Sequence, residues 1–208
     1  MSQPIAVIDY GMGNLRSVEK ALEIAGGKVR VVSDRNGIES CDKLVFPGVG
    51  SFGDAMKELK ARRLIEPIKT AIKKGKPFLG LCLGLQLLFE NSEEAPGVKG
   101  LGILTGTVRR FRSGTLKVPH MGWNNIVAGR SSLVVGKKIL KGVPNGSYMY
   151  FVHSYYVKPK DKSVVLTTTD YGIKFASAVA VGNIYGLQFH PEKSQATGLK
   201  ILKNFVGL

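Results

Sequence analysis

Cysteine, histidine and long apolar runs are scarce in this 208-residue sequence. Its two cysteines, Cys41 and Cys82, are too few for a disulfide scaffold and suit a reducing compartment. Its three histidines, His120, His153 and His190, make a Cys/His-rich zinc site unexpected, and we predict no metal. No apolar run reaches the roughly 18 residues that a membrane-spanning helix needs. The sequence therefore predicts no membrane role.

The opening segment, MSQPIAVIDY, lacks the basic and apolar regions of a secretory signal, so we expect a cytoplasmic protein. Apolar residues make up 44% of the chain and charged residues 22%, which is ordinary globular composition and argues against intrinsic disorder. Because domains usually hold roughly 100–200 residues, we expect residues 1–208 to form a single domain.

Acidic residues are few. Asp and Glu number 15 against 30 Lys and Arg, which gives a formal net charge of +15. Such a chain attracts anions, whether nucleic acid, phosphorylated metabolites or an acidic partner. Its basic residues are densest over 57–76 and 109–112, without a basic tail or an interleaved aromatic–basic motif. Nucleic-acid binding by a basic α/β protein is therefore an alternative that we do not favour.

Strand and helix patterns alternate through the first 90 residues, which predicts parallel strands joined by crossover helices. Short apolar runs predict strands at 4–9, 29–32, 43–46 and 78–81. Helical patterns cover 15–25, 54–74 with Pro67 opening a second helix, 83–90 and 195–205. Further strands are indicated at 101–112, 148–158, 163–169, 175–181 and 184–189. The prediction is an α/β fold whose largely parallel central sheet is flanked by helices, with an added β-rich portion in the second half.

The sequence GLCLG at 80–84 lies where a predicted strand meets a predicted helix. This is the arrangement of a nucleophile elbow, with Cys82 in place of serine. The glycines permit the close backbone contact of a sharp turn, and the following helix favours thiolate over thiol. The amide of Leu83 would then point toward an oxyanion. A buried structural cysteine is the alternative, and it is the favoured one for Cys41.

A cysteine nucleophile needs a base and a group that orients the base. The sequence FHPE at 189–192 supplies both, because residues i and i+2 of an extended chain project to one face. His190 and Glu192 can thus lie side by side, although an incidental ion pair in a surface turn would look the same. His120 and His153 have no carboxylate two residues away, so we rank them lower.

The sequence PGVG at 47–50 follows another predicted strand. Backbone amides near Gly48 and Val49 could supply a second oxyanion donor, although a plain strand-ending turn would also read this way. The segment GMGNLR at 11–16 fails as a dinucleotide fingerprint because Arg16 occupies the third glycine position, and no P-loop sequence occurs.

Two motifs, GLCLGLQ at 80–86 and HPE at 190–192, resemble those of the class I (triad-type) glutamine amidotransferases in order and in their spacing of about a hundred residues. Four more stretches resemble the branch of that family that supplies ammonia for imidazole glycerol phosphate synthesis. They are IDYGMGNL at 8–15, PGVGSF at 47–52, PHMGWN at 119–124 and YFVHSY at 150–155. The likeness spans about 5–206.

The resemblance implies a glutaminase that hydrolyses glutamine through a Cys82-His190-Glu192 triad and needs no cofactor. Its oxyanion donors would be Gly48, Val49 and Leu83. The resemblance also implies a glutamine pocket formed by Gln86, Tyr150, Ser154 and Tyr155. For Gln86 the plainer alternative is an ordinary helix residue.

The resemblance further implies a heterodimer with a (β/α)8-barrel cyclase subunit, which uses the ammonia in histidine biosynthesis. The residues implied at that interface are Asn14, Met121, Trp123 and Asn124, the last three on a loop, and Lys193. Core packing is the alternative for Trp123, because Trp is usually mostly buried. A paralogous subunit that feeds another acceptor would have the same triad. The +15 charge either complements an acidic cyclase or reflects a lysine-rich, heat-loving source, and a salt titration of the affinity separates the two.

Overall fold

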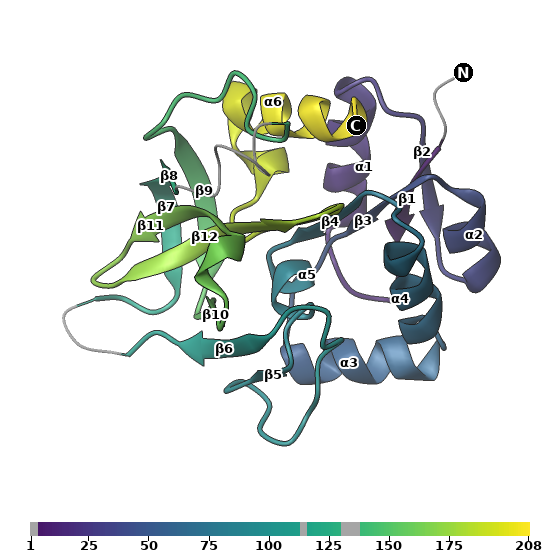
Figure 1. The fold of residues 1–208 in the computed structure, drawn as a ribbon, viewed down its shortest axis with the longest axis horizontal. Helices are drawn as coiled ribbons and strands as arrows, with labels where there is room; N and C mark the ends of the chain where they lie inside the picture. Colours follow the sequence, from purple (N-terminus) through teal and green to yellow (C-terminus); the bar gives the residue numbers. More distant parts are fainter. Residues whose placement is uncertain (1–3, 113–115, 130–137) are drawn as a thin grey trace.

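The computed structural model describes residues 4–112, 116–129 and 138–208. The described residues form an α/β fold with one large sheet and one small sheet (Figure 1). The strands are β1 Ile5–Ile8, β2 Val29–Val32, β3 Lys43–Phe46, β4 Phe78–Leu81, β5 Asn91–Ser92, β6 Gly106–Arg110, β7 His120–Asn125, β8 Val127–Ala128, β9 Tyr148–His153, β10 Tyr155–Pro159, β11 Val165–Asp170, β12 Lys174–Val181 and β13 Ile184–Leu187. The helices are α1 Leu15–Ile24, α2 Arg35–Ser40, α3 Phe52–Ala61, α4 Ile65–Lys73, α5 Leu83–Gln86 and α6 Gln195–Val206, with short 3-10 turns η2 Lys162–Val164 and η3 Pro191–Lys193.

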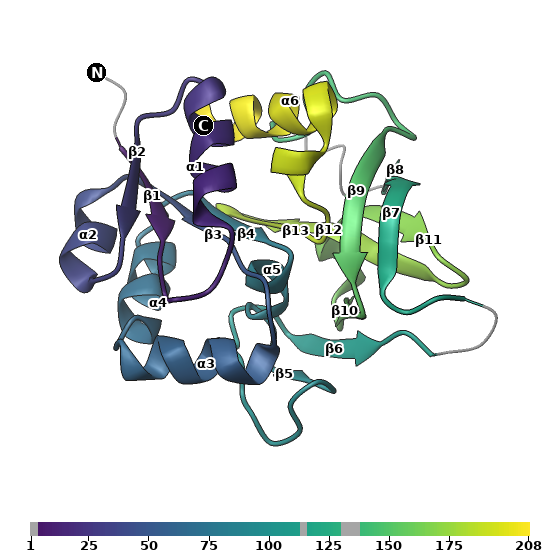
Figure 2. The same cartoon turned by 180° about the vertical axis from the view of Figure 1, so that it is seen from behind.

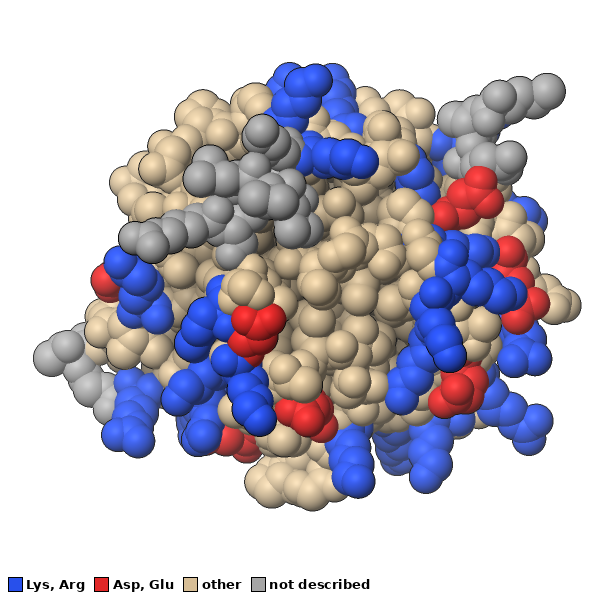
Figure 3. All heavy atoms as spheres, in the orientation of Figure 1, with Lys and Arg blue, Asp and Glu red and all other residues tan. Residues whose placement is uncertain are grey.

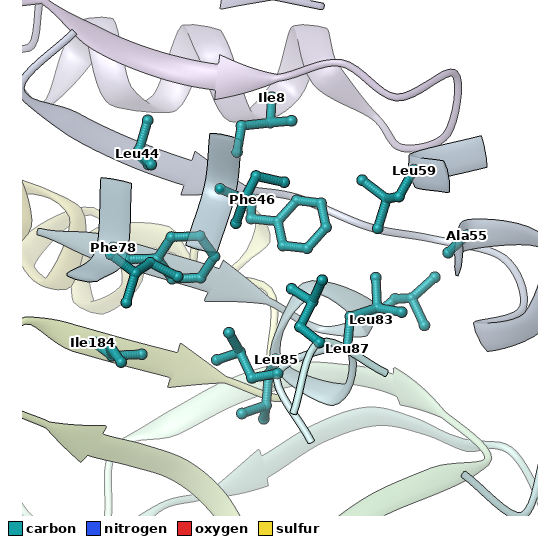
Figure 4. Close-up of a cluster of buried hydrophobic side chains, with 14 of the residues drawn as sticks. Ile8, Leu44, Phe46, Ala55, Leu59, Phe78, Leu83, Leu85, Leu87 and Ile184 are labelled. Atoms are coloured by element: carbon teal, nitrogen blue, oxygen red, sulfur yellow. The ribbon is translucent and has the colours of Figure 1, made fainter. Parts of the chain in front are cut away.

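The first half of the chain forms the parallel part of the large sheet, as predicted. The strand order runs β2-β1-β3-β4-β13, and every neighbouring pair in this run is parallel. Helices α1 and α6 cover one face and α3, α4 and α5 the other (Figures 1 and 2). Ile5 and Val7 pack under α1 and α6, whereas Ala6 and Ile8 pack against the opposite helices. Figure 4 shows Ile8 in this second cluster with Phe46 of β3 and Leu59 of α3. Both faces are buried, which explains the unbroken apolar strands of the sequence.

The second half adds the predicted β-rich portion. Strand β12 pairs antiparallel with β13, β10 and β11, and the large sheet continues through β10 to β6 and β5. Strands β7 and β9 form the separate small sheet, in which His120 pairs with His153. The antiparallel strands therefore continue directly from β13, whose parallel neighbour β4 leads into the cysteine elbow.

Some predicted elements differ from those observed. The helix expected over 83–90 stops at Gln86, and the strand expected over 101–112 occupies only Gly106–Arg110. One set of hydrogen bonds accounts for both differences, because the amides of 101–104 donate to the carbonyls of 87–89 instead of extending a strand. Helix α2 was not predicted; Asp34 caps it by accepting from the amide of Gly37.

A loop was expected at Met121–Asn124, but residues 120–125 form strand β7. Gly and Asn are weak strand formers, so local propensity favoured a loop, and the pairing with β9 overrides it. Helix α4 begins at Ile65, which places Pro67 within its first turn. None of the helices in the described ranges is both long and apolar enough to cross a bilayer.

Candidate active site

Cys82 occupies the predicted elbow between β4 and α5. Its backbone has φ 52° and ψ −106°, a left-handed conformation that residues with a Cβ rarely adopt. Its amide donates to the carbonyl of Leu187 on β13 at 2.7 Å, which fixes the turn at the carboxyl edge of the sheet. Strain of this kind persists only where the surrounding structure enforces it, and it is concentrated at functional sites.

The two glycines of the elbow are required by close backbone approach. A Cβ on Gly80 would lie 2.7 Å from the carbonyl oxygen of Gly84, and a Cβ on Gly84 would collide with the carbonyl oxygen of Phe46. Neither obstacle is a flexible side chain that could move aside. The turn that presents Cys82 is therefore possible only with glycine at both positions.

His190 and Glu192 form a buried pair beside this turn. Nδ1 of His190 lies 2.8 Å from Oε1 of Glu192, and the two side chains are 5% and 3% exposed. The chain reaches this geometry differently from the prediction, because β13 ends at Leu187 and Pro191–Lys193 form a 3-10 turn. A tight turn, and not an extended strand, brings the two side chains together.

The electrostatics of His190 follow from its surroundings. Burial on its own lowers the pKa of the imidazole, because it disfavours the charged ring. The interactions with Cys82 and Glu192 outweigh burial and raise the pKa of His190 to about 10. Its Nε2 is buried and has no hydrogen-bond partner among the described residues. This nitrogen is therefore available for proton transfer next to the sulfur.

A cavity of about 360 Å³ opens over the cysteine. The predicted site residues among those that line it are Cys82, Leu83, His190, Val49, Gln86, Ser154 and Tyr155. Tyr150 is not among them; its ring lies 6.0 Å from that of Trp123 and 5.8 Å from Nζ of Lys193. Glu94 also lines the cavity, and burial raises the pKa of its carboxyl although its hydrogen bond from the Phe52 amide opposes this.

The segment 47–50 adopts a conformation that closes the expected oxyanion hole. The amide of Leu83, one of the predicted oxyanion donors, is hydrogen-bonded at 3.4 Å to the carbonyl oxygen of Gly48. Gly48 thus directs an acceptor to the place where a donor is needed. Gly50 has φ 103°, and a Cβ on Gly48 would lie 2.6 Å from the hydroxyl of the buried Tyr10.

Residues 6–207 match the protein family described as Glutamine amidotransferase class-I. The chain belongs to this family. A curated relative from Aquifex aeolicus, named imidazole glycerol phosphate synthase subunit HisH, is 55% identical over 200 residues, covering 96% of this chain and 94% of the relative. A relative of the same name from Moorella thermoacetica is 49% identical over 203 residues, covering 98% and 94%.

Solved structures of other amidotransferases share the fold. The structure of PurLQS from Thermotoga maritima has a TM-score of 0.77 at 20% identity and covers 100% of this chain and 99% of that one. A structure described as a glutamine amidotransferase has a TM-score of 0.75 at 19% identity and covers 98% and 99%. At such identities the likeness establishes the fold alone.

One residue of this amidotransferase site was missed by the sequence reasoning. Gln188 is fully buried, and its Nε2 donates to Sγ of Cys82 at 3.6 Å. Its Oε1 accepts from Nε2 of Gln86 at 3.2 Å. The available signal was a lone amide within the apolar run 184–189, because a polar side chain there must find a buried partner.

The residues expected at a partner interface lie on two neighbouring parts of the amidotransferase surface. Met121 and Trp123 on β7 are 63% and 47% exposed. Asn14 and Lys193 line a cavity of about 20 Å³ together with His190 and Glu192. Asn124 points inward instead, and its Nδ2 donates to the carbonyl of Asp170 at 2.9 Å.

Proposed function

We propose that this chain hydrolyses glutamine to glutamate and ammonia through a Cys82-His190-Glu192 triad, and that the ammonia passes to a cyclase subunit in histidine biosynthesis. One observation supports this proposal most directly. Cys82 is held at positive φ and lines a cavity that His190 also lines, and His190 is hydrogen-bonded to Glu192. The names of the relatives support the choice of pathway. We further propose one type-1 glutamine amidotransferase domain over 1–208, in the cytoplasm, working without a cofactor.

The catalytic steps follow from the available atoms. The Cys82 thiolate attacks the side-chain amide carbon of glutamine, and a carbon–sulfur bond forms. His190, protonated beside two negative groups, gives its Nε2 proton to the departing nitrogen, so the carbon–nitrogen bond breaks and ammonia leaves. Water then attacks the thioester while His190 takes a proton, and the carbon–sulfur bond breaks to release glutamate. Glu192 holds the imidazole in orientation through Nδ1.

The cavity suits a small amino-acid substrate. Its volume of about 360 Å³ lies at the lower end of the range for ligand sites. We propose that Gln86, Ser154 and Tyr155 bind the glutamine there. Tyr150 was expected in the same pocket, and its neighbours Trp123 and Lys193 instead support a place beside the proposed interface.

We propose that the resting chain is nearly idle because the Gly48 carbonyl occupies the Leu83 amide. Binding of the cyclase and its ligand would have to turn segment 47–50 so that amides of Gly48 and Val49 face the oxyanion. One oxyanion donor is worth roughly 10²–10³-fold in rate, so glutamate release should rise by about that factor in the liganded complex. The measurement is glutamate production by the pure chain, with and without the cyclase and its substrate. A pure chain that already runs at the rate of the complex would contradict this proposal.

An exposed apolar patch supports a partner at β7. Met121, Trp123 and Tyr148 are 63%, 47% and 61% exposed, and exposed patches of large apolar side chains mark interaction surfaces. We propose that a (β/α)8-barrel cyclase covers this patch in a heterodimer, with Trp123 as its anchor and with Asn14 and Lys193 at the adjoining edge. The alternative cyclase-independent paralogue would carry the same triad but would bind a different partner.

Replacing Trp123 by alanine should weaken cyclase binding by at least roughly thirtyfold, because a central aromatic anchor contributes about 2 kcal/mol or more. The stability of the chain should change little, since Trp123 is about half exposed. Calorimetric titration with the cyclase measures the affinity. Ile24→Ala is the matched control, because Ile24 is a 66% exposed apolar residue on α1. Equal affinities of the two variants would place the interface elsewhere.

The same titration at rising salt tests the origin of the charge. Figure 3 shows Lys and Arg side chains at the top, along the lower edge and at the right of the face it draws, around a broad central area without charged side chains. If these residues complement an acidic cyclase, the affinity falls as salt screens the attraction. An affinity independent of salt would leave the lysine-rich composition of the source as the explanation.

A further inference from the structure

Two buried histidines face each other across the small sheet. His120 on β7 is the cross-strand partner of His153 on β9, and Nδ1 of His120 lies 3.0 Å from Nε2 of His153. The two residues are 3% and 6% exposed, and neither belongs to the triad. Polar rings in an apolar core are destabilising unless their nitrogens are partnered. The partners of all four ring nitrogens therefore define what this pair does.

The direction of each hydrogen bond can be assigned. Nδ1 of His153 lies 2.7 Å from the carbonyl oxygen of Tyr155, which only accepts, so Nδ1 carries the proton. Burial lowers the pKa of His153 to about 3, so the ring is neutral and its Nε2 accepts from Nδ1 of His120. Burial also lowers the pKa of His120 to about 4. Its Nε2 therefore accepts from Nδ2 of Asn124 at 3.3 Å.

The hydrogen bonds continue from the same carbonyl to the sulfur. The Tyr155 oxygen also accepts from Nε2 of Gln86 at 3.0 Å, and that amide donates its other hydrogen to Oε1 of Gln188 at 3.2 Å. Nε2 of Gln188 donates to Sγ of Cys82 at 3.6 Å. Six consecutive hydrogen bonds thus connect Asn124 on β7 with the nucleophile.

Strand β7 has one face toward solvent and one toward this chain of hydrogen bonds. Met121 and Trp123 project outward, whereas His120 is buried and Asn124 bonds to it. The His120 ring is stacked between the rings of Phe151 and Tyr171, with centroids 4.8 Å and 4.0 Å away. Stacking fixes the ring orientation, so a displacement of β7 changes the geometry of the bond to His153.

We propose that His120, His153 and Gln188 are positioning residues that hold the Cys82 sulfur in a fixed position relative to β7. The inference deepens the proposed function, on which it rests for the identity of the reaction and of the partner on the outer face of β7. A thiolate accepts a hydrogen bond more strongly than a thiol, so the Gln188 amide favours the reactive form. The histidines hold Tyr155, and through it Gln86 and Gln188, in the position from which that bond is made.

The test is the rate at which iodoacetamide alkylates Cys82 at neutral pH in the full chain, located by mass spectrometry. Alkylation needs the thiolate but no glutamine. Gln188→Met keeps the length of the side chain, and we expect the alkylation rate to fall by at least roughly tenfold. His120→Phe keeps the stacked ring, and we expect a fall of roughly threefold although it touches no atom of Cys82. His120→Gln, which can accept from Asn124 and donate to His153, should restore most of the rate.

The double variant separates positioning from general damage. His120→Phe combined with Gln188→Met should be no slower than Gln188→Met alone, because the chain is already broken at the sulfur. Effects that multiply would overturn the proposal. Asn183→Ala is the control, because it removes side-chain hydrogen bonds to the Ile72 and Lys76 carbonyls at the opposite end of β4. It should lower stability and leave alkylation unchanged; an equal loss there would also overturn the proposal.

A spectroscopic readout covers the case in which His120→Phe does not fold. Nitrogen-15 NMR of the unmodified chain at neutral pH should find both His120 and His153 neutral with the proton on Nδ1. A proton on Nε2 of His153 would break the chain and refute the proposal. Glutamate release is measured beside these readouts. If alkylation depends on His120 but the chain hydrolyses no glutamine even with the cyclase and its substrate bound, the positioning role stands and the proposed function is refuted. If alkylation does not depend on His120 and the complex hydrolyses glutamine, the positioning role is refuted and the proposed function stands.

Discussion

Replacement of Cys82 by alanine should abolish glutamate release, with a fall of at least roughly 10⁴-fold in the fully activated complex. The proposed triad offers no other nucleophile, and removal of one member of such a unit removes nearly all of its contribution. Folding should be little affected, because alanine keeps the Cβ of the elbow and the sulfur's hydrogen bonds to Gln188 and the Val152 carbonyl are long, at 3.6 Å and 3.9 Å. Coupled assay of glutamate, with thermal unfolding alongside, measures both quantities.

Serine at the same position sharpens the test. Cys82→Ser keeps the elbow and a nucleophilic atom but replaces an ionisable thiol by a hydroxyl, which is a far weaker acid and does not ionise beside a protonated His190, so it should be as inactive as Cys82→Ala. Cys41→Ala is the matched control, because Cys41 is the other free thiol, fully buried at the end of α2. It should retain activity. Glutamate release by either Cys82 variant at the unmodified rate would remove the nucleophile from the proposal.

The elbow could be predicted because its requirements are local. A short apolar strand, two glycines and a cysteine between them predict a sharp turn, and in the structure that turn holds Cys82 at positive φ. The parallel half of the sheet was predictable for a similar reason. Strands buried on both faces have continuous apolar sequences, and the intervening helices have the matching period.

What could not be predicted depends on contacts between distant segments. Residues 120–125 become a strand only because β9 pairs with them, and α5 is one turn long because 101–104 bind the carbonyls that follow it. A one-turn helix also contributes less dipole at Cys82 than the expected helix would have done. The orientation of the Gly48 peptide is a further case, since the sequence PGVG permits both orientations and the contact with Leu83 selects one.

Replacing Glu192 by glutamine should lower glutamate release in the complex by roughly 10³–10⁴-fold. The amide can still contact His190, but it carries no charge and can hold the wrong tautomer, as in other triads in which the orienting carboxylate is neutralised. The buried carboxylate is one of the two groups that outweigh burial and raise the pKa of His190 to about 10. Glu39→Gln, at an exposed carboxylate on α2, is the control and should leave the rate unchanged.

The pH dependence gives this variant a second readout. The folded-state pKa of His190 lies above its ordinary value of 6.5, so its protonation contributes stability that is fully present below pH 6.5 and is lost as the pH rises toward 10. Without the carboxylate that pKa falls, so both the loss of stability and the alkaline limb of the activity profile should move to lower pH. Profiles of the variant and of the unmodified chain that coincide would show that Glu192 does not act on the imidazole. The loss of rate would then have to come from altered packing around the 3-10 turn at Pro191–Lys193.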